Sequence, residues 1–166
     1  MKMEQKQQPL PIGVVMKWWG ELEEHRGDRA ELRRCRSPAE VVFVPAFYRL
    51  KAMMPESMNT MHLAAVAGIL SHVEAHLDGT ARTAELFAHP KERGSTPRVS
   101  ELRFRRLLRV PDYSYDELYP MMTRLLRQID RKAHLPSLIP AIYWWNSLTK
   151  RRWAESYYEH LARTEK

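Results

Sequence analysis

The arginines in the second half of the chain are the side chains best suited to a chemical role. The stretch ELRFRRLLRV, residues 101–110, contains four of them among leucine and phenylalanine. On a helical projection Phe104, Leu107 and Leu108 share one face, the cations lie on the opposite face or at its boundary, and only Leu102 breaks the division. These cations are Arg103, Arg105, Arg106 and Arg109. The division predicts a helix that packs through one side and presents positive charge on the other.

A second row of arginines follows at helical spacing. Arg124, Arg127 and Arg131 recur at i, i+3 and i+7, so a helix that continues to about residue 132 aligns them on one side. A solvated helix face usually mixes both signs of charge, but the only acid between residues 121 and 132 is Asp130. Guanidinium groups present a fork of donors that fits phosphate. The rows favour a nucleic-acid partner, with a solvated face or an acidic protein surface as alternatives.

Other cations extend the candidate nucleic-acid interface. A secondary group lies in the first half of the chain and comprises Arg33, Arg34, Arg49 and Lys51. Near the C-terminus, Arg151 and Arg152 adjoin several aromatic residues: Trp144, Trp145, Trp153, Tyr157 and Tyr158. Aromatic rings beside cations can stack the bases of a single strand, although core packing is the commoner role and is favoured for most of them.

Signals for catalysis or metal binding are weak. His72 and His76 are four residues apart, which would place two ligands on one helix face, but their order is not the H-E-x-x-H of zinc proteases. The carboxylates that would serve a magnesium-dependent nuclease are Asp112, Asp116 and Glu117. Helix capping and turn formation explain these acids more simply. No catalytic residue, metal ligand or cofactor is therefore predicted.

The single cysteine is Cys35, which lies between Arg34 and Arg36. Neighbouring cations would lower the pKa of its thiol, whereas a lone cysteine is more often a small buried residue. One cysteine forms no internal disulfide, so a reducing cytoplasm is the expected location. The sequence contains no signal peptide and no run long enough to span a membrane, and no membrane partner is expected.

Charge is concentrated in one segment. The 166-residue chain carries a net charge of +7, and residues 91–152 contain 14 Lys and Arg against 6 Asp and Glu, a local charge of +8. The excess of positive charge therefore lies in the segment that holds both arginine rows. Such a surplus is typical of proteins that bind nucleic acid.

The elements that must position these arginines are helices, so the predicted fold class is all-α. Apolar spacing predicts a regular helix over residues 59–77 with a stripe facing the core. Ser100 is a candidate cap for the helix of the first row. Residues 135–140, LPSLIP, are predicted to be a connector, and a last helix is predicted over residues 141–164.

Two small helical-bundle subdomains joined by a short linker are predicted. Residues 1–11 form a flexible tail, and residues 12–88 form the N-terminal subdomain. Residues 89–97, HPKERGSTP, mix proline, glycine, serine and charge, as linkers between domains commonly do. Residues 98–166 form the C-terminal subdomain.

A longer match points to a family. RAELRRCRSPAEVVFVPAFYRL, residues 29–50, resembles the CasB family, the small subunit of the type I-E CRISPR Cascade surveillance complex. RVSELRFRRLLR (98–109), TRLLRQ (123–128) and YWWN (143–146) are similar to later helices of that family. The resemblance implies a non-catalytic protein of two helical subdomains. It also implies two copies in the complex, with electrostatic binding of nucleic-acid backbones.

The resemblance further implies a set of partners: guide RNA, target DNA, the displaced single-stranded DNA, other Cascade subunits and a second copy of the same chain. It implies that the protein stabilises the R-loop in antiviral defence. Two other functions remain open from the residues alone. One is an adaptor that docks acidic protein surfaces without touching nucleic acid, and the other is the small magnesium-dependent nuclease.

Overall fold

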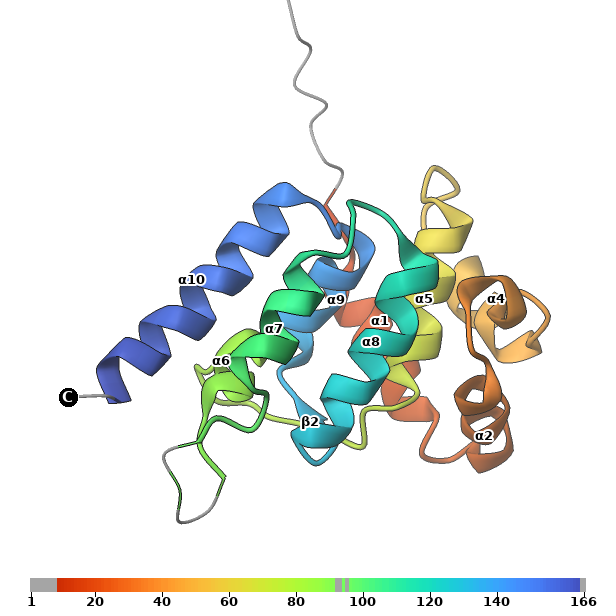
Figure 1. The fold of residues 1–166 in the computed structure, drawn as a ribbon. Coiled ribbons are helices and arrows are strands. Elements are labelled where there is room, and N and C mark those ends of the chain that lie inside the picture. The colour runs from red at the N-terminus through yellow and green to blue at the C-terminus, as the bar shows by residue number, and fades with distance from the viewer. Residues whose placement is uncertain (1–8, 92–93, 95, 165–166) are drawn as a thin grey trace, which may run out of the picture.

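The computed structural model describes residues 9–91, 94 and 96–164, so residues 1–8 of the predicted tail lie outside the described part. Within that part nearly every element is a helix (Figure 1). The helices are α1 (Ile12–Glu21), α2 (Arg26–Arg34), α3 (Pro38–Val41), α4 (Pro45–Ala52), α5 (Thr60–Leu70), α6 (Thr83–Ala88), α7 (Glu101–Leu108), α8 (Tyr115–Gln128), α9 (Leu135–Tyr143) and α10 (Ser147–Thr164). The predicted all-α fold class is confirmed.

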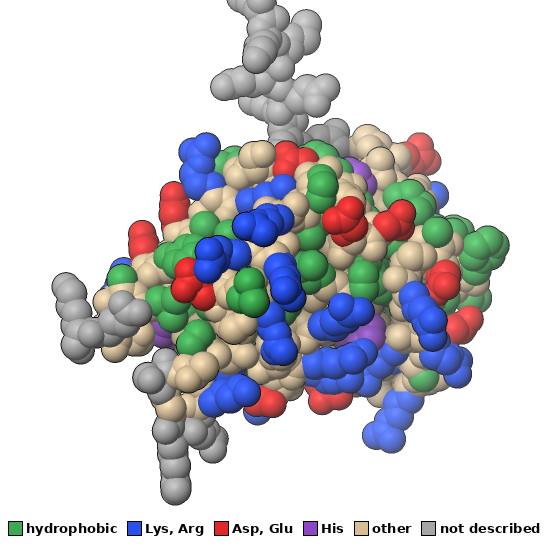
Figure 2. All heavy atoms as spheres, in the orientation of Figure 1, with side chains coloured by type: hydrophobic (Ala, Val, Ile, Leu, Met, Phe, Trp, Pro, Cys, Tyr) green, Lys and Arg blue, Asp and Glu red, His purple; other side chains and the backbone are tan. Residues whose placement is uncertain are grey.

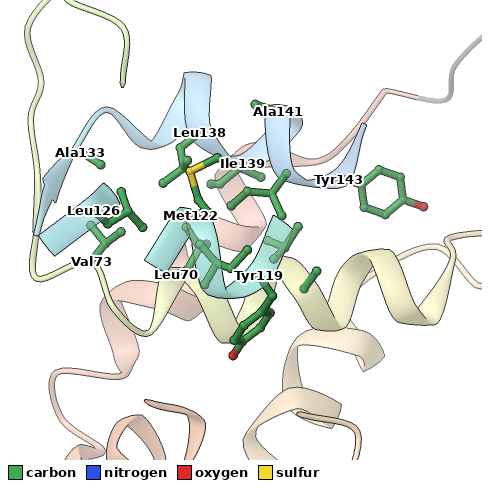
Figure 3. Close-up of a cluster of buried hydrophobic side chains, with 14 of the residues drawn as sticks. Leu70, Val73, Tyr119, Met122, Leu126, Ala133, Leu138, Ile139, Ala141 and Tyr143 are labelled. Carbon is green, nitrogen blue, oxygen red and sulfur yellow. The ribbon is translucent and has the colours of Figure 1, made fainter. Parts of the chain in front are cut away.

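The centre of the molecule is α5, which other helices enclose. Every residue from Leu63 to Leu70 is buried, and α5 contacts α2, α3, α4, α8 and α9. Figure 3 shows side chains of α5, α8 and α9 meeting in this core. Small residues allow the close approach: a side chain at Gly68 would collide with the ring of Tyr119 on α8. The predicted stripe does face the core, but from Leu63 to Leu70 the other sides of α5 are buried as well.

The predicted helix over residues 59–77 is also too long. Asn59 caps α5 by accepting from the backbone N–H groups of Met61 and His62, and the helix ends at Leu70. The chain then forms the strand β1 (Ala75–His76), which pairs in parallel with β2 (Lys132–Ala133). The helix ends early because the following residues pair with a segment far along the sequence. Local sequence patterns do not predict this pairing.

The C-terminal region divides differently from the prediction. LPSLIP, predicted as a connector, forms the first two turns of α9, where a proline at the start needs no hydrogen-bonded N–H. The chain leaves the helix at Trp144 and restarts at Ser147. The Asp112 carboxylate accepts from the Ser147 backbone N–H at 3.2 Å and from its hydroxyl at 3.0 Å. This contact gives α10 its own start, so the single helix predicted over 141–164 is wrong.

Helices from both predicted subdomains share one buried cluster. Its members run from Val15 in α1 to Tyr157 in α10, and α1 contacts α9 while α6 contacts α10. Residues 92, 93 and 95 of the predicted linker lie outside the described part. The division into two subdomains, residues 12–88 and 98–166, stays a prediction. Among the described residues, no helix combines the length and apolar character needed to cross a bilayer.

Two buried tyrosines give a matched test of this core. The Tyr119 hydroxyl is buried with no hydrogen-bond partner among the described residues, whereas the Tyr157 hydroxyl donates to the Val99 carbonyl at 2.7 Å. Tyr119→Phe should leave the free energy of unfolding unchanged or raise it by up to about 1 kcal/mol. Tyr157→Phe should lower it by about 1–2 kcal/mol, since a buried carbonyl loses its donor. Urea denaturation measures both, and equal losses in the two variants would contradict the hydrogen-bond assignment.

Candidate nucleic-acid interface

The first arginine row lies on α7. The Ser100 hydroxyl accepts from the Arg103 backbone N–H at 3.3 Å, so the predicted cap is confirmed. Phe104 and Leu107 are fully buried, and Phe104 stacks on Tyr157 of α10 with ring centroids 3.9 Å apart. The opposite side presents exposed cations: Arg103, Arg105, Arg106 and Arg109. The packing face thus holds α7 against α10 and leaves the guanidinium groups in solvent.

The second row begins on α8. Arg124 and Arg127 are exposed, and the other side of the helix is buried through Met122, Leu125 and Leu126. The prediction that all three arginines share one helix is wrong, because α8 ends at Gln128. Arg131 follows in a turn with a φ of 58°. Its carbonyl accepts from the backbone N–H groups of Glu74 and Ala75 at 2.8 and 3.3 Å, so the β1 segment fixes its position.

Arg33 of α2 joins this site from the first half of the chain. Its Nε donates to the Ser71 carbonyl at 2.6 Å, and its Nη2 lies 3.5 Å from the Glu74 carboxylate. Partial burial, together with the nearby charges of Arg33 and Arg127, lowers the pKa of Arg131, and Glu74 opposes this effect. We call Arg33, Arg127 and Arg131 the arginine cluster. The sequence has no local signal for it, because the contact joins two distant segments.

The cations cover one face of the molecule. In the orientation of Figure 1, Figure 2 shows Lys and Arg side chains spread over α7 and α8 and across to α2. Arg34, at the end of α2, and Lys51, on α4, are exposed. Arg49 on α4 forms an ion pair with Asp28 of α2 at 2.6 Å. Because its guanidinium is already paired with Asp28, Arg49 is less available to bind a phosphate than Arg34 is.

Arg151 and Arg152 are exposed on α10. Arg152 lines an open groove of about 820 Å³ together with Trp144 and the start of α1, and no residue of α7 or α8 lines it. The prediction that most C-terminal aromatic side chains pack in the core is confirmed, since Trp145, Trp153 and Tyr157 are buried. The structure therefore places Arg152 on a groove that none of the arginine cluster lines.

The histidine pair and the carboxylate Asp112, considered as metal ligands from the sequence, have other roles in the folded chain. His72 and His76 do not share a helix, because α5 ends before both and His76 lies in β1. The His76 Nε2 pairs with Asp78 at 2.9 Å. Asp112 is held by a 2.7 Å ion pair with Lys150, and hydrogen bonds from Lys150 and Ser147 lower the pKa of its carboxyl. Its oxygens are thus occupied by the start of α10.

Cys35 does not have the low pKa that its arginine neighbours suggested. The side chain is half-buried. Burial raises the pKa of its thiol, the charges of Glu40 and Glu31 raise it further, and Arg34 opposes them only in part. The raised pKa counts against the alternative of an activated thiolate and favours the predicted role of a small packed residue.

His72 reports on the electrostatics of the arginine cluster. It is only 6% exposed, and its Nδ1 has no hydrogen-bond partner among the described residues. Burial, together with the charges of Arg131, Arg33 and Arg127, lowers the pKa of His72 to about 4. The imidazole is therefore neutral at pH 7 beneath a positively charged surface.

This pKa predicts a pH dependence of stability. Because the folded pKa lies below the unfolded value of about 6.5, the unfolded chain binds more protons between these values. The contribution of His72 to the free energy of unfolding should be fully present above pH 6.5. It should fall by about 3 kcal/mol as the pH drops to 4. In urea titrations across this range, His72→Gln should flatten the dependence, whereas the exposed-site control His25→Gln should not. An unchanged slope in His72→Gln would contradict the assignment.

Comparisons with known proteins agree with this fold. A chain of the crystal structure of E. coli Cascade, bound to a PAM-containing double-stranded DNA target, superimposes with a TM-score of 0.72 at 19% identity. The likeness covers 93% of this chain and 99% of that chain and concerns the fold. No curated protein matches the sequence. Residues 28–158 match the family described as CRISPR-associated protein Cse2. This match spans most of the chain, which therefore belongs to the Cse2 family, the CasB small-subunit family that its sequence motifs resemble.

Proposed function

We propose that this protein is the non-catalytic small subunit of a type I-E Cascade complex and that it holds nucleic-acid backbones through its arginine face. The arginine face comprises the cations of α7, α8 and the arginine cluster: Arg33, Arg103, Arg105, Arg106, Arg109, Arg124, Arg127 and Arg131. Membership of the Cse2 family supports the assembly. The similar E. coli structure is that of a Cascade bound to a DNA target.

The observation that carries the proposal is the arginine cluster. Three guanidinium groups from two distant segments lie close enough for Arg33 and Arg127 to lower the pKa of Arg131. Glu74 is a weak counter-charge for them, since it lies 3.5 Å from Arg33 and is 54% exposed. A phosphate between these groups would relieve their mutual repulsion and accept their hydrogen bonds. Phosphate contacts of this kind position a strand without reading its sequence.

Such contacts suit the formation of an R-loop. Replacing a DNA duplex by an RNA–DNA heteroduplex is nearly balanced in free energy, so modest contacts with the backbone tip it. In this proposal the arginine face contacts the guide RNA and target DNA backbones and helps retain the displaced single strand. Arg34, Arg49, Lys51, Arg151 and Arg152 would provide secondary contacts. Other Cascade subunits and a second copy of the chain complete the assembly in the cytoplasm.

A charge-reversal experiment tests the arginine face. The triple variant Arg124→Glu, Arg127→Glu, Arg131→Glu should weaken binding to single-stranded DNA. It should also reduce the dependence of log K on log salt by about 2, because each phosphate contact contributes about 0.7. The control triple variant is Lys17→Glu, Arg82→Glu, Arg163→Glu. It changes the net charge equally at exposed positions on α1, at the start of α6 and on α10, and its salt dependence should stay near that of the wild type.

Wild-type affinity and salt dependence in the α8 variant would overturn the assignment. Normal DNA binding combined with loss of assembly with the other subunits would favour the adaptor that docks acidic protein surfaces. Magnesium-dependent cleavage of DNA by the purified protein would overturn the non-catalytic role.

A further inference from the structure

Three metal-binding side chains meet where α6 contacts α10. Glu85 lies on α6, His89 directly follows that helix, and His160 lies on α10. One oxygen of Glu85 faces both imidazoles, at 4.0 Å from the His89 Nε2 and 3.4 Å from the His160 Nδ1. The two rings stack with centroids 4.4 Å apart. Among the described residues, this is the only group of three His, Cys, Asp or Glu side chains whose ligand atoms all lie within 4.8 Å of one another.

The geometry points to a zinc site formed by Glu85, His89 and His160. Imidazole nitrogen and carboxylate oxygen bind Zn²⁺ at about 2.0–2.2 Å, and a tetrahedral ion therefore needs ligand atoms about 3.3–3.5 Å apart. The separation between Glu85 and His160 already meets this requirement. The His89 Nε2 lies 4.0 Å from the Glu85 oxygen, so its ring has to turn to approach an ion, and its side chain is 39% exposed, which leaves it room to do so. The donor set matches zinc better than magnesium, which prefers oxygen ligands alone.

A fourth ligand has space beside the cluster. A small depression of about 180 Å³ is lined by Glu85 and His160 and is mostly polar. A water molecule there would complete the coordination of a zinc ion held by three protein ligands. Arg82 and Arg163 also line the depression, and their charges oppose a cation. Arg163 is partly neutralised by Glu159, 3.9 Å away, so the opposing charge falls mainly on Arg82.

A bound ion would join segments that are far apart in the sequence. Glu85 and His89 lie four residues apart around the end of α6, and His89 is the first residue of the segment 89–97, whereas His160 lies in the last helix. The ion would therefore clamp the C-terminal half of α10 onto α6. This clamp is independent of the arginine face, because none of its three ligands belongs to α7 or α8.

Metal titration of the full chain without a histidine tag tests the site. One equivalent of Zn²⁺ should bind and raise the melting temperature by about 5–10 °C when zinc is at 100 times its dissociation constant. Mg²⁺ should not. Co²⁺ should give the visible absorption of a four-coordinate ion. His89→Gln and His160→Gln should each abolish the thermal shift, and Glu85→Gln should reduce it, whereas the control His25→Gln should respond as the wild type does.

Without zinc, the melting temperatures of these variants should be close to that of the wild type, because the three side chains are only partly buried. Absence of stoichiometric zinc binding by the wild type would overturn the site. So would an equal zinc response in the wild type and in both His89→Gln and His160→Gln.

Discussion

Mutual repulsion among Arg33, Arg127 and Arg131 is the constraint around which the interface is arranged. Like charges separate unless the fold holds them, and direct contacts hold two of these three residues. Arg33 is fixed by the Ser71 carbonyl, Arg127 lies on the exposed face of α8, and Arg131 is placed by its backbone contacts to β1. Burial, with the charges of these arginines adding to it, lowers the pKa of the nearby His72, which stays neutral at pH 7. An anion bound beside these three groups would lower their mutual repulsion.

The helices around α5 make this arrangement possible. Because α5 is buried on every side from Leu63 to Leu70, α2 and α8 both pack against it, and Arg33 of α2 donates to the Ser71 carbonyl just beyond its last residue. The short parallel pair β1–β2 ties the end of α8 to the segment after α5. This tie brings a residue from the second half of the chain beside Arg33. The charged surface thus depends on contacts made in the apolar core and not on helix spacing alone.

Sequence patterns correctly predicted the features that depend on interactions between neighbouring residues. The division of α7 into apolar and cationic faces and the cap at Ser100 follow from helical periodicity and side-chain chemistry, and both are present. The end of α5, the start of α9 and the turn at Arg131 depend on pairing between distant segments, and sequence patterns misplaced them. The grouping of Glu85, His89 and His160 has the same origin: i, i+4 spacing marks the first two residues, but only tertiary packing adds the third.

Photo-cross-linking within an assembled Cascade gives the most direct test of the arginine face. Leu102 is 55% exposed among the arginines of α7, whereas Met61 is 41% exposed at the start of α5. A photoreactive residue at position 102 should cross-link to guide RNA or target DNA once the R-loop forms, and one at position 61 should not. Cross-links from position 102 to protein subunits alone would contradict nucleic-acid binding by this surface.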